Sequence, residues 1–247
     1  MYFSGQGKLF VAAVSGGVPG PFRFVGNVPE LTIQMETDVL EHKESSSGQR
    51  LTDLRLIREK TASFSATLED FSEENLALAL YGTNTQIAAG NVTGEAFPNP
   101  VANGDYVRLA KQKVSSVVIK DSAATPATLT PGTHYEVASA DHGTIKILNI
   151  GTFVQPFKAD YSYAQVQNIN LFTQAQPQVW LRFEGLNTAD ANKPVLVELY
   201  KCAPNPLNEL ALIGEEIAQM QLEGSVLYDE TKVSDTVLGQ FGRVVLI

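Results

Sequence analysis

The clearest pattern along the chain is an alternation of apolar and polar residues that begins at Glu30. In the stretch ELTIQMETDVL, Leu31, Ile33 and Met35 share one face. The polar positions on the opposite face are Thr32, Gln34, Glu36 and Asp38. A period of two is typical of a β-strand with one buried face. We therefore expect a half-buried antiparallel strand here.

A polar segment, residues 38–56 (DVLEHKESSSGQRLTDLRL), follows this strand and holds mixed charges, three serines and a glycine. Leu54 and Leu56 share a parity that resumes at Ala62 and Phe64. A strand of such length exceeds the usual run of about five to six residues, so we expect it to bend, bulge or extend beyond the domain body. The polar segment is either an ordinary solvated loop or a tongue that contacts another copy of the chain.

One helix is predicted over residues 72–81, in the sequence FSEENLALALYG. Ser72 is a suitable N-cap, and Glu73 and Glu74 lie in the first turn, where the helix dipole favours negative charge. Gly82 is suited to a left-handed C-terminal cap. The short apolar stripe of this helix predicts that it covers a sheet.

The rest of the chain predicts short strands. Residues 84–103 are rich in Gly, Asn, Pro and Thr and indicate loop with at most one short strand. The later strand patterns are VSSVVIK, THYEVAS, GTIKILN, FKADYSYAQV, NINLFT, QVWLRFEGL, PVLVELYKC and IAQMQLEGSVLY. Their spacing is typical of all-β domains. We expect an all-β dominated fold with one flanking helix.

Composition narrows the class of protein. A chain of 247 residues is long enough for one large domain, and its net charge of −9 argues against nonspecific nucleic-acid binding. The single cysteine, Cys202, cannot form an internal disulfide. The apolar run at residues 9–14 predicts a buried strand rather than a signal peptide, because no basic region precedes it. No stretch approaches the roughly eighteen apolar residues of a membrane span, so we expect a soluble protein made inside the cell.

Candidate chemistry is sparse. His42, His134 and His142 have no second ligand at metal spacing, and we expect neither a metal site, nor catalytic residues, nor a cofactor. Glu36 and Asp38 share a strand face, but nothing else converges on them, so a solvated or pore-facing surface is favoured over catalysis.

The aromatic residues leave a different alternative open. Trp180, Tyr161 and Tyr163 could stack on a sugar if they were exposed, which would fit a carbohydrate-binding or adhesin-like β-sandwich. Their apolar neighbours favour packing in a core or an interface.

The run from FRFVGNVPELTIQMETDVLEHKESSSGQ through REKTASFSATLEDFSEENLALALYGT resembles the major tail tube proteins of long-tailed, siphovirus-like bacteriophages. Shared features are an alternating strand, a polar loop with Ser and Gly, a second long strand and a helix of the form ENLALAL. The resemblance covers about residues 20–85, and the stretches VQNINLFT, VWLRFEGLN and PVLVELYKC resemble the closing strands of that family.

The resemblance implies an antiparallel β-sandwich or half-barrel of the phage tail tube type. It implies one tail tube domain over residues 1–247, with a core at about 1–85 and 160–247 and an elaborated β-rich middle at about 90–160. Six copies would form a ring, and rings would stack into the hollow tail tube that conducts DNA during ejection. Expected partners are a tape measure protein in the lumen and tail terminator and tail-tip or baseplate proteins. DNA would pass without specific binding, and no membrane is involved. The protein would be assembled in the host bacterial cytoplasm and reside in the virion tail.

The resemblance also assigns residues. The ring-stacking loop would comprise Glu41, Lys43, Glu44, Ser45, Ser46, Ser47, Gly48 and Arg50. The lumen face would comprise Thr32, Gln34, Glu36 and Asp38. Acidic walls suit a lumen that passes DNA, because basic walls would bind phosphate.

Overall fold

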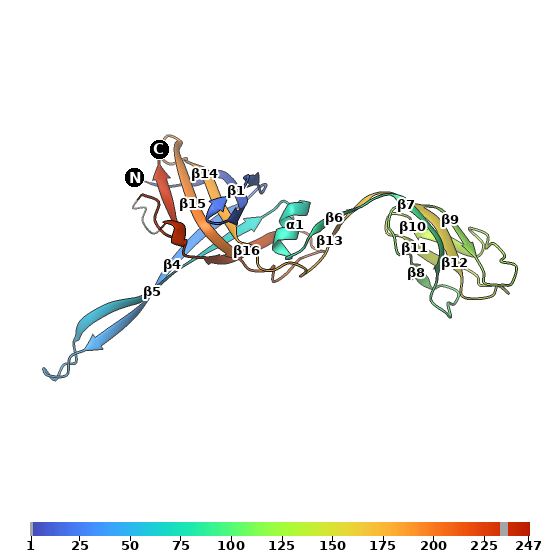
Figure 1. The fold of residues 1–247 in the computed structure, drawn as a ribbon, viewed down its shortest axis with the longest axis horizontal. Helices are drawn as coiled ribbons and strands as arrows, with labels where there is room; N and C mark the ends of the chain where they lie inside the picture. Colours follow the sequence, from blue (N-terminus) through green and yellow to red (C-terminus); the bar gives the residue numbers. More distant parts are fainter. Residues whose placement is uncertain (1, 233–236) are drawn as a thin grey trace. The chain divides into compact units, whose positions relative to one another are not determined.

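The computed structural model describes residues 2–232 and 237–247. Antiparallel sheets and one short α-helix build an all-β fold, as the sequence predicts. The chain divides into two compact units: unit 1 is Met1–Asn84 with Ile169–Ile247, and unit 2 is Thr85–Asn168 (Figure 1). Unit 2 therefore contains the β-rich middle segment.

Unit 1 is built on a nine-stranded sheet in the order β2-β1-β14-β15-β16-β5-β4, with β3 on β1 and β17 on β15. The strands are β1 (Gly5–Ser15), β2 (Val18–Pro19), β3 (Arg23–Phe24), β4 (Glu30–Lys43), β5 (Thr52–Leu68), β14 (Val179–Asn187), β15 (Lys193–Pro204), β16 (Met220–Val226) and β17 (Gly242–Leu246). Within the described residues β4 pairs only with β5, so its outer side is a free edge.

The main core of unit 1 lies on one face of this sheet, and a smaller buried cluster of Ala12, Trp180 and Tyr200 lies on the other. Phe64 and Leu68 of β5 pack in the main core with Leu222 of β16 and Leu181 of β14, each 2% exposed. Helix α1 (Glu73–Ala79) covers part of this core with the buried Ala79 and the half-buried Leu76. On β5 the buried positions end at Phe64, so the core holds only the inner part of that strand.

Helix α1 is shorter than the predicted 72–81, and its caps differ from expectation. Ser72 occupies the N-cap in an extended conformation, but its side chain makes no capping hydrogen bond. At the other end Tyr81, not Gly82, adopts the left-handed conformation (φ 50°), and the Gly82 amide donates to the Ala77 carbonyl at 2.9 Å. Gly82 is required for another reason: a Cβ there would lie 1.9 Å from the Asn170 carbonyl oxygen.

Unit 2 contains two three-stranded sheets around a core of its own. One sheet has the order β7 (Gly90–Ala96), β12 (Lys158–Tyr163), β9 (Val114–Lys120), and the other β10 (Tyr135–Ser139), β11 (Thr144–Ile147), β8 (Tyr106–Arg108). A separate ladder pairs β6 (Asn84–Ile87) with β13 (Val166–Ile169). The expectation of mostly loop over residues 84–103 is therefore wrong: β6 and β7 form there, because both pair with strands far along the sequence.

Candidate functional site

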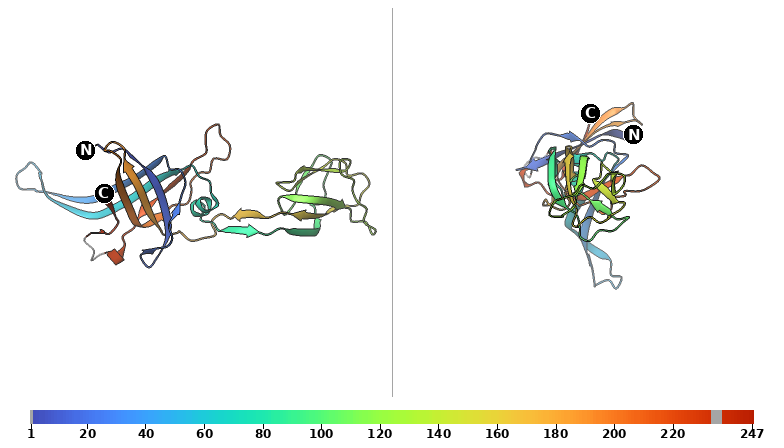
Figure 2. Two further views of the ribbon diagram at one scale, coloured as in Figure 1. Left: turned by 90° about the horizontal axis from the view of Figure 1, so that it is seen from above. Right: turned by 90° about the vertical axis from the view of Figure 1, so that its right-hand side faces the viewer.

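The β4–β5 hairpin extends beyond the sheet of unit 1. The two strands are paired from Glu30 opposite Thr67 to Lys43 opposite Thr52, whereas β16 pairs with β5 only from Ala62 to Leu68. Beyond Ala62 the ladder therefore has two strands only, and it projects from the body (Figure 2). An isolated two-stranded ribbon is marginally stable in water, so this projection is a structural cost that calls for a functional explanation.

Two β-bulges decide which way the hairpin side chains face. The register shifts after Asp38, leaving Arg58 as an extra residue on β5, and shifts again between His42 and Lys43. As a result Leu56 lies opposite Leu40. Because β4 alternates without interruption, Leu40 shares the face of Asp38. The predicted common parity of Leu54 and Leu56 with Phe64 is therefore wrong, since the bulge transfers the two leucines to the opposite face.

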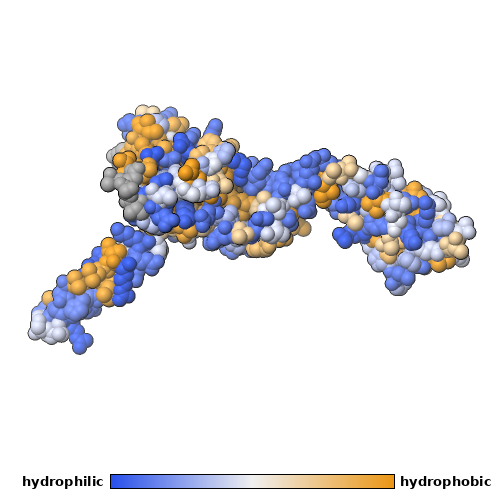
Figure 3. Space-filling model, in the orientation of Figure 1, coloured by the Kyte–Doolittle hydropathy of each residue, from blue (hydrophilic) through white to orange (hydrophobic). Residues whose placement is uncertain are grey.

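The distal hairpin, residues 39–58, exposes apolar side chains on both faces. Leu40, Leu54 and Leu56 on one face are 39%, 48% and 49% exposed. Ile57 on the other face is 57% exposed. Figure 3 shows apolar residues, in orange, on the side of the projecting hairpin that faces the viewer. Single exposed apolar residues are ordinary, but a contiguous set of them indicates an interaction surface.

The hairpin tip, residues 44–51, is organised around one carboxylate. Glu44 accepts hydrogen bonds from the backbone amides of Ser46 (2.7 Å) and Ser47 (2.8 Å) and from both serine hydroxyls. These hydrogen bonds lower the pKa of Glu44 to about 2, with the Ser47 hydroxyl contributing most. Gly48 and Arg50 adopt left-handed conformations that close the turn. The residues assigned to the ring-stacking loop thus lie together at or beside one tip.

The distal hairpin carries a small net positive charge, since its four Lys and Arg residues outnumber its three Asp and Glu residues. Each of its acids has a partner: Glu41 lies 3.9 Å from Arg55, Asp53 lies 2.6 Å from His42, and Glu44 binds the serines. Within the described residues no ion pair involves the three remaining cations, which are Lys43, Arg50 and Arg58. On a chain of net charge −9, this segment is suited to an acidic partner surface.

The residues assigned to the lumen lie on an exposed face shared by three strands. All four β4 positions are exposed, and they face Ser65, Ser63, Thr61 and Glu59 of β5. Glu223 of β16 continues the same face beside Ser65. Among the paired residues on this face of the three strands, every Lys, Arg, Asp or Glu is acidic, and we call this set the acidic face: Glu30, Glu36, Asp38, Glu59 and Glu223.

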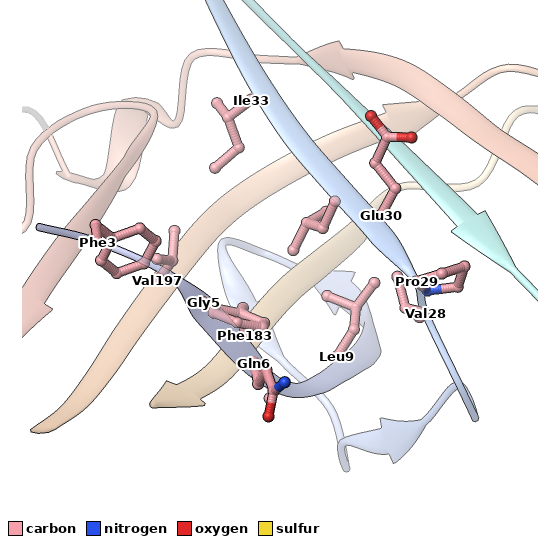
Figure 4. A pocket seen from close by; sticks show the side chains of 12 residues that line it. Phe3, Gly5, Gln6, Leu9, Val28, Pro29, Glu30, Ile33, Phe183 and Val197 are labelled. Carbon is pink, nitrogen blue, oxygen red and sulfur yellow. The ribbon is translucent and has the colours of Figure 1, made fainter. Parts of the chain in front are cut away.

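The opposite side of β4 is not the buried face that the sequence predicts: Leu31 is partly buried, but Ile33 and Met35 are 36% and 82% exposed, because the core of unit 1 reaches only the first residues of the strand. This side borders an apolar groove of about 390 Å³. Figure 4 shows Phe3, Leu9, Ile33, Phe183 and Val197 around it. Glu30 is the one titratable side chain in the lining. A lone carboxylate does not form an acid–base pair or a metal site, so the groove offers packing rather than chemistry.

A second exposed apolar segment was not predicted from the sequence. Residues 205–219 connect β15 to β16, and within them Leu212, Ile213 and Ile217 are 83%, 99% and 79% exposed. The pattern IAQMQLEGSVLY predicts a strand from Ile217, but β16 begins at Met220. An apolar residue before a strand is normally assigned to that strand, so only the structure reveals this surface.

The alternative site types find little support. Trp180 is 7% exposed and Tyr161 is 3% exposed, so neither ring is available to stack on a sugar. Tyr163 is half-buried, and Lys111 Nζ lies 5.3 Å from the centre of its ring. Within residues 2–232 and 237–247, no three His, Cys, Asp or Glu side chains are grouped to hold a metal ion. Over the same residues, none of the helical segments has the length and apolar character of a membrane span.

Comparison with known proteins gives a family. No curated protein matches the sequence. One family profile matches residues 2–245, nearly the whole chain. The chain therefore belongs to the family described as protein of unknown function UCP028589.

Proposed function

We propose that this chain is a structural virion protein that self-assembles into stacked hexameric rings, forming the hollow tail tube of a long-tailed bacteriophage. The observation that carries the proposal is the projecting β4–β5 hairpin with exposed leucines on a two-stranded ribbon. Such a surface remains in water in a lone subunit and is covered when an identical subunit packs on it. The number of subunits per ring comes from the sequence resemblance.

Free sheet edges support association around a ring. The outer side of β4 is unpaired over Glu30–Lys43, and β17 pairs only with β15 among the described strands. Unpaired edges invite pairing with another chain, and a closed ring removes them. A half-barrel of the tail tube type, with α1 at its flank, is the version of the all-β fold that this proposal requires.

The acidic face supports a role as the wall of a DNA conduit. Asp38 lies directly opposite Glu59, a like-charge arrangement that weakens a sheet. A loss of sheet stability from like charges is consistent with a surface whose function is to repel DNA. DNA passing a wall of carboxylates is repelled from every side and is not retained, whereas a basic wall would bind its phosphates.

The proposed assembly implies further partners. A tape measure protein would fill the lumen during assembly, and terminator and tail-tip or baseplate proteins would close the ends. Assembly would take place in the host bacterial cytoplasm, and the mature location would be the virion tail. The chain would act without a cofactor and without enzymatic activity.

Sedimentation velocity of the purified chain over a hundredfold range of concentration tests the proposal. We expect species far larger than the 26.7 kDa subunit to grow with concentration. A single monomeric species throughout the range contradicts the proposal.

A further inference from the structure

Two of the exposed apolar segments of unit 1, the distal hairpin and residues 205–219, lie at opposite ends of β5. The hairpin tip precedes its first residue, Thr52. At its last residue, Leu68, β5 pairs with Met220, which directly follows residues 205–219. Gln219 Nε2 also donates to Glu69 Oε1 at 3.1 Å. This second segment, which we call the β15–β16 loop, is thus fixed to the end of the sheet away from the tip (Figure 2).

The β15–β16 loop is anchored at its base and apolar at its crest. The Leu207 amide donates to the Ala79 carbonyl at 2.8 Å, and Leu207 and Leu210 pack against the core of unit 1. Beyond them the chain turns outward, and Ile213 is 99% exposed. Leucine and isoleucine side chains at such exposure are stabilised when a partner surface covers them.

The charges around the two segments have opposite signs. Residues 205–219 contain no Lys or Arg, and their three acids are Glu209, Glu215 and Glu216. All three are exposed. The distal hairpin instead carries Lys43, Arg50 and Arg58, none of which has an ion-pair partner within the described residues. Because the two apolar surfaces belong to the same chain and carry opposite charges, each surface is complementary to the other one on a second copy. We therefore take a second copy of the chain as the partner.

We propose that the β15–β16 loop of one copy is the docking surface for the hairpin tip of the next copy. Leu212, Ile213 and Ile217 would cover apolar residues of the distal hairpin. The hairpin residues covered in this way would be Leu51, Leu54 and Leu56, which are three of the exposed apolar residues of the distal hairpin. Because the two surfaces differ and lie at opposite ends of one strand, the contact is head-to-tail and can repeat from one copy to the next. This inference rests on the proposed function and names the contact between successive rings.

Charge reversal tests the contact. One variant combines Lys43→Glu, Arg50→Glu and Arg58→Glu, and the other combines Glu209→Lys, Glu215→Lys and Glu216→Lys. Each alone should lower the amount of pelletable assembly at least tenfold, and a chain carrying all six changes should recover it. The matched control, Asp141→Lys with Lys158→Glu in unit 2, should assemble as the unaltered chain does. Near-ultraviolet circular dichroism verifies that each variant is folded.

The outcomes separate the inference from the function on which it rests. If the unaltered chain assembles and either folded triple variant assembles equally well, the docking inference is wrong and the tube proposal stands. Failure of the six-fold variant to recover, with its fold intact, also overturns the docking inference. An unaltered chain that remains monomeric contradicts the tube proposal itself.

Cross-linking provides a second, independent measurement. A mixture of Arg50→Cys chains with Ile213→Cys chains should form an intermolecular disulfide on oxidation, whereas neither variant alone should. Cys202 does not compete, because it is buried and desolvation raises its thiol pKa to about 12. An assembled mixture that gives no disulfide between the two chains overturns the inference.

Discussion

Glu44 is the residue on which the shape of the hairpin tip depends. Its carboxylate accepts hydrogen bonds from the amides and hydroxyls of Ser46 and Ser47. The carboxylate thus takes the place of the backbone carbonyls to which these amides would donate in a regular ladder. Hydrogen bonds to the ionised form lower a carboxyl pKa, here from 4.5 to about 2. The tip conformation is thus linked to the charge of one side chain.

The pH dependence of the tip follows from this pKa. Because the pKa of Glu44 is lower in the folded tip, the stabilisation is complete above pH 4.5 and is lost as the pH falls through about 2. We expect the Glu44 carboxyl resonance in an NMR titration to have its midpoint near 2, and the Ser46 and Ser47 amides to lose protection there. A Glu44→Gln variant should lack this protection at neutral pH. A midpoint at the ordinary value of 4.5 contradicts this account.

At the scale of single residues, the sequence predicts the position of the helix ends better than the role that each residue plays there. Ser72 occupies the predicted N-cap but makes no cap bond, and Tyr81 takes the left-handed position expected of Gly82. Gly82 is needed because the backbone of Asn170, far along the chain, passes against it. No local pattern contains that contact.

At the scale of the element, β5 combines a buried half and an exposed half in one strand. Its unusual length is predicted from the sequence, and of the expected alternatives, bending, bulging or extension beyond the domain body, the structure shows both bulges and an extension. The bulge at Arg58 could not be placed, because its position depends on the pairing with β4. For the same reason the sequence assigns Leu56 to the wrong face.

The two halves of β5 should respond differently to the same substitution. Leu68→Ala removes a core side chain that is 2% exposed, and should lower the free energy of unfolding by about 2–5 kcal/mol. Leu56→Ala removes one that is 49% exposed, and should change it by no more than about 0.5 kcal/mol while reducing assembly. Urea unfolding of unassembled subunits and sedimentation measure the two effects. Equal destabilisation by both changes would show that the distal hairpin packs within its own subunit.

At the scale of the whole molecule, the proposed tube depends on surfaces that a single chain leaves uncovered. The sequence predicts the all-β class, and the acidic residues of β4 are exposed. The half-buried strand expected from the alternation is wrong over most of β4, because Ile33 and Met35 on the opposite face are exposed too. The acids that complete the acidic face, Glu59 and Glu223, come from other strands and are revealed only by the pairing. The exposure of the apolar residues in the β15–β16 loop is likewise recognised only when the structure shows which residues form the core.

The acidic face gives a prediction for the assembled particle. Replacing Glu36 and Asp38 by Lys should leave tubes intact, because both side chains are exposed and the lysine that replaces Asp38 would pair favourably with Glu59. DNA ejection should be slowed or blocked, since the wall would then attract phosphate. Time-resolved release of DNA from particles carrying the variant tail measures this. A neutral variant, Glu36→Gln with Asp38→Asn, should release DNA at nearly the normal rate, and normal release by the lysine variant would rule out the lumen assignment.

The central claim is self-assembly through the β4–β5 hairpin, and electron microscopy of the concentrated, purified chain tests it most directly. The account predicts hollow tubes of stacked rings from the unaltered chain, and folded subunits that do not stack when residues 44–48 are deleted. Strictly monomeric particles from the unaltered chain, or full-length tubes from the deletion variant, would contradict it.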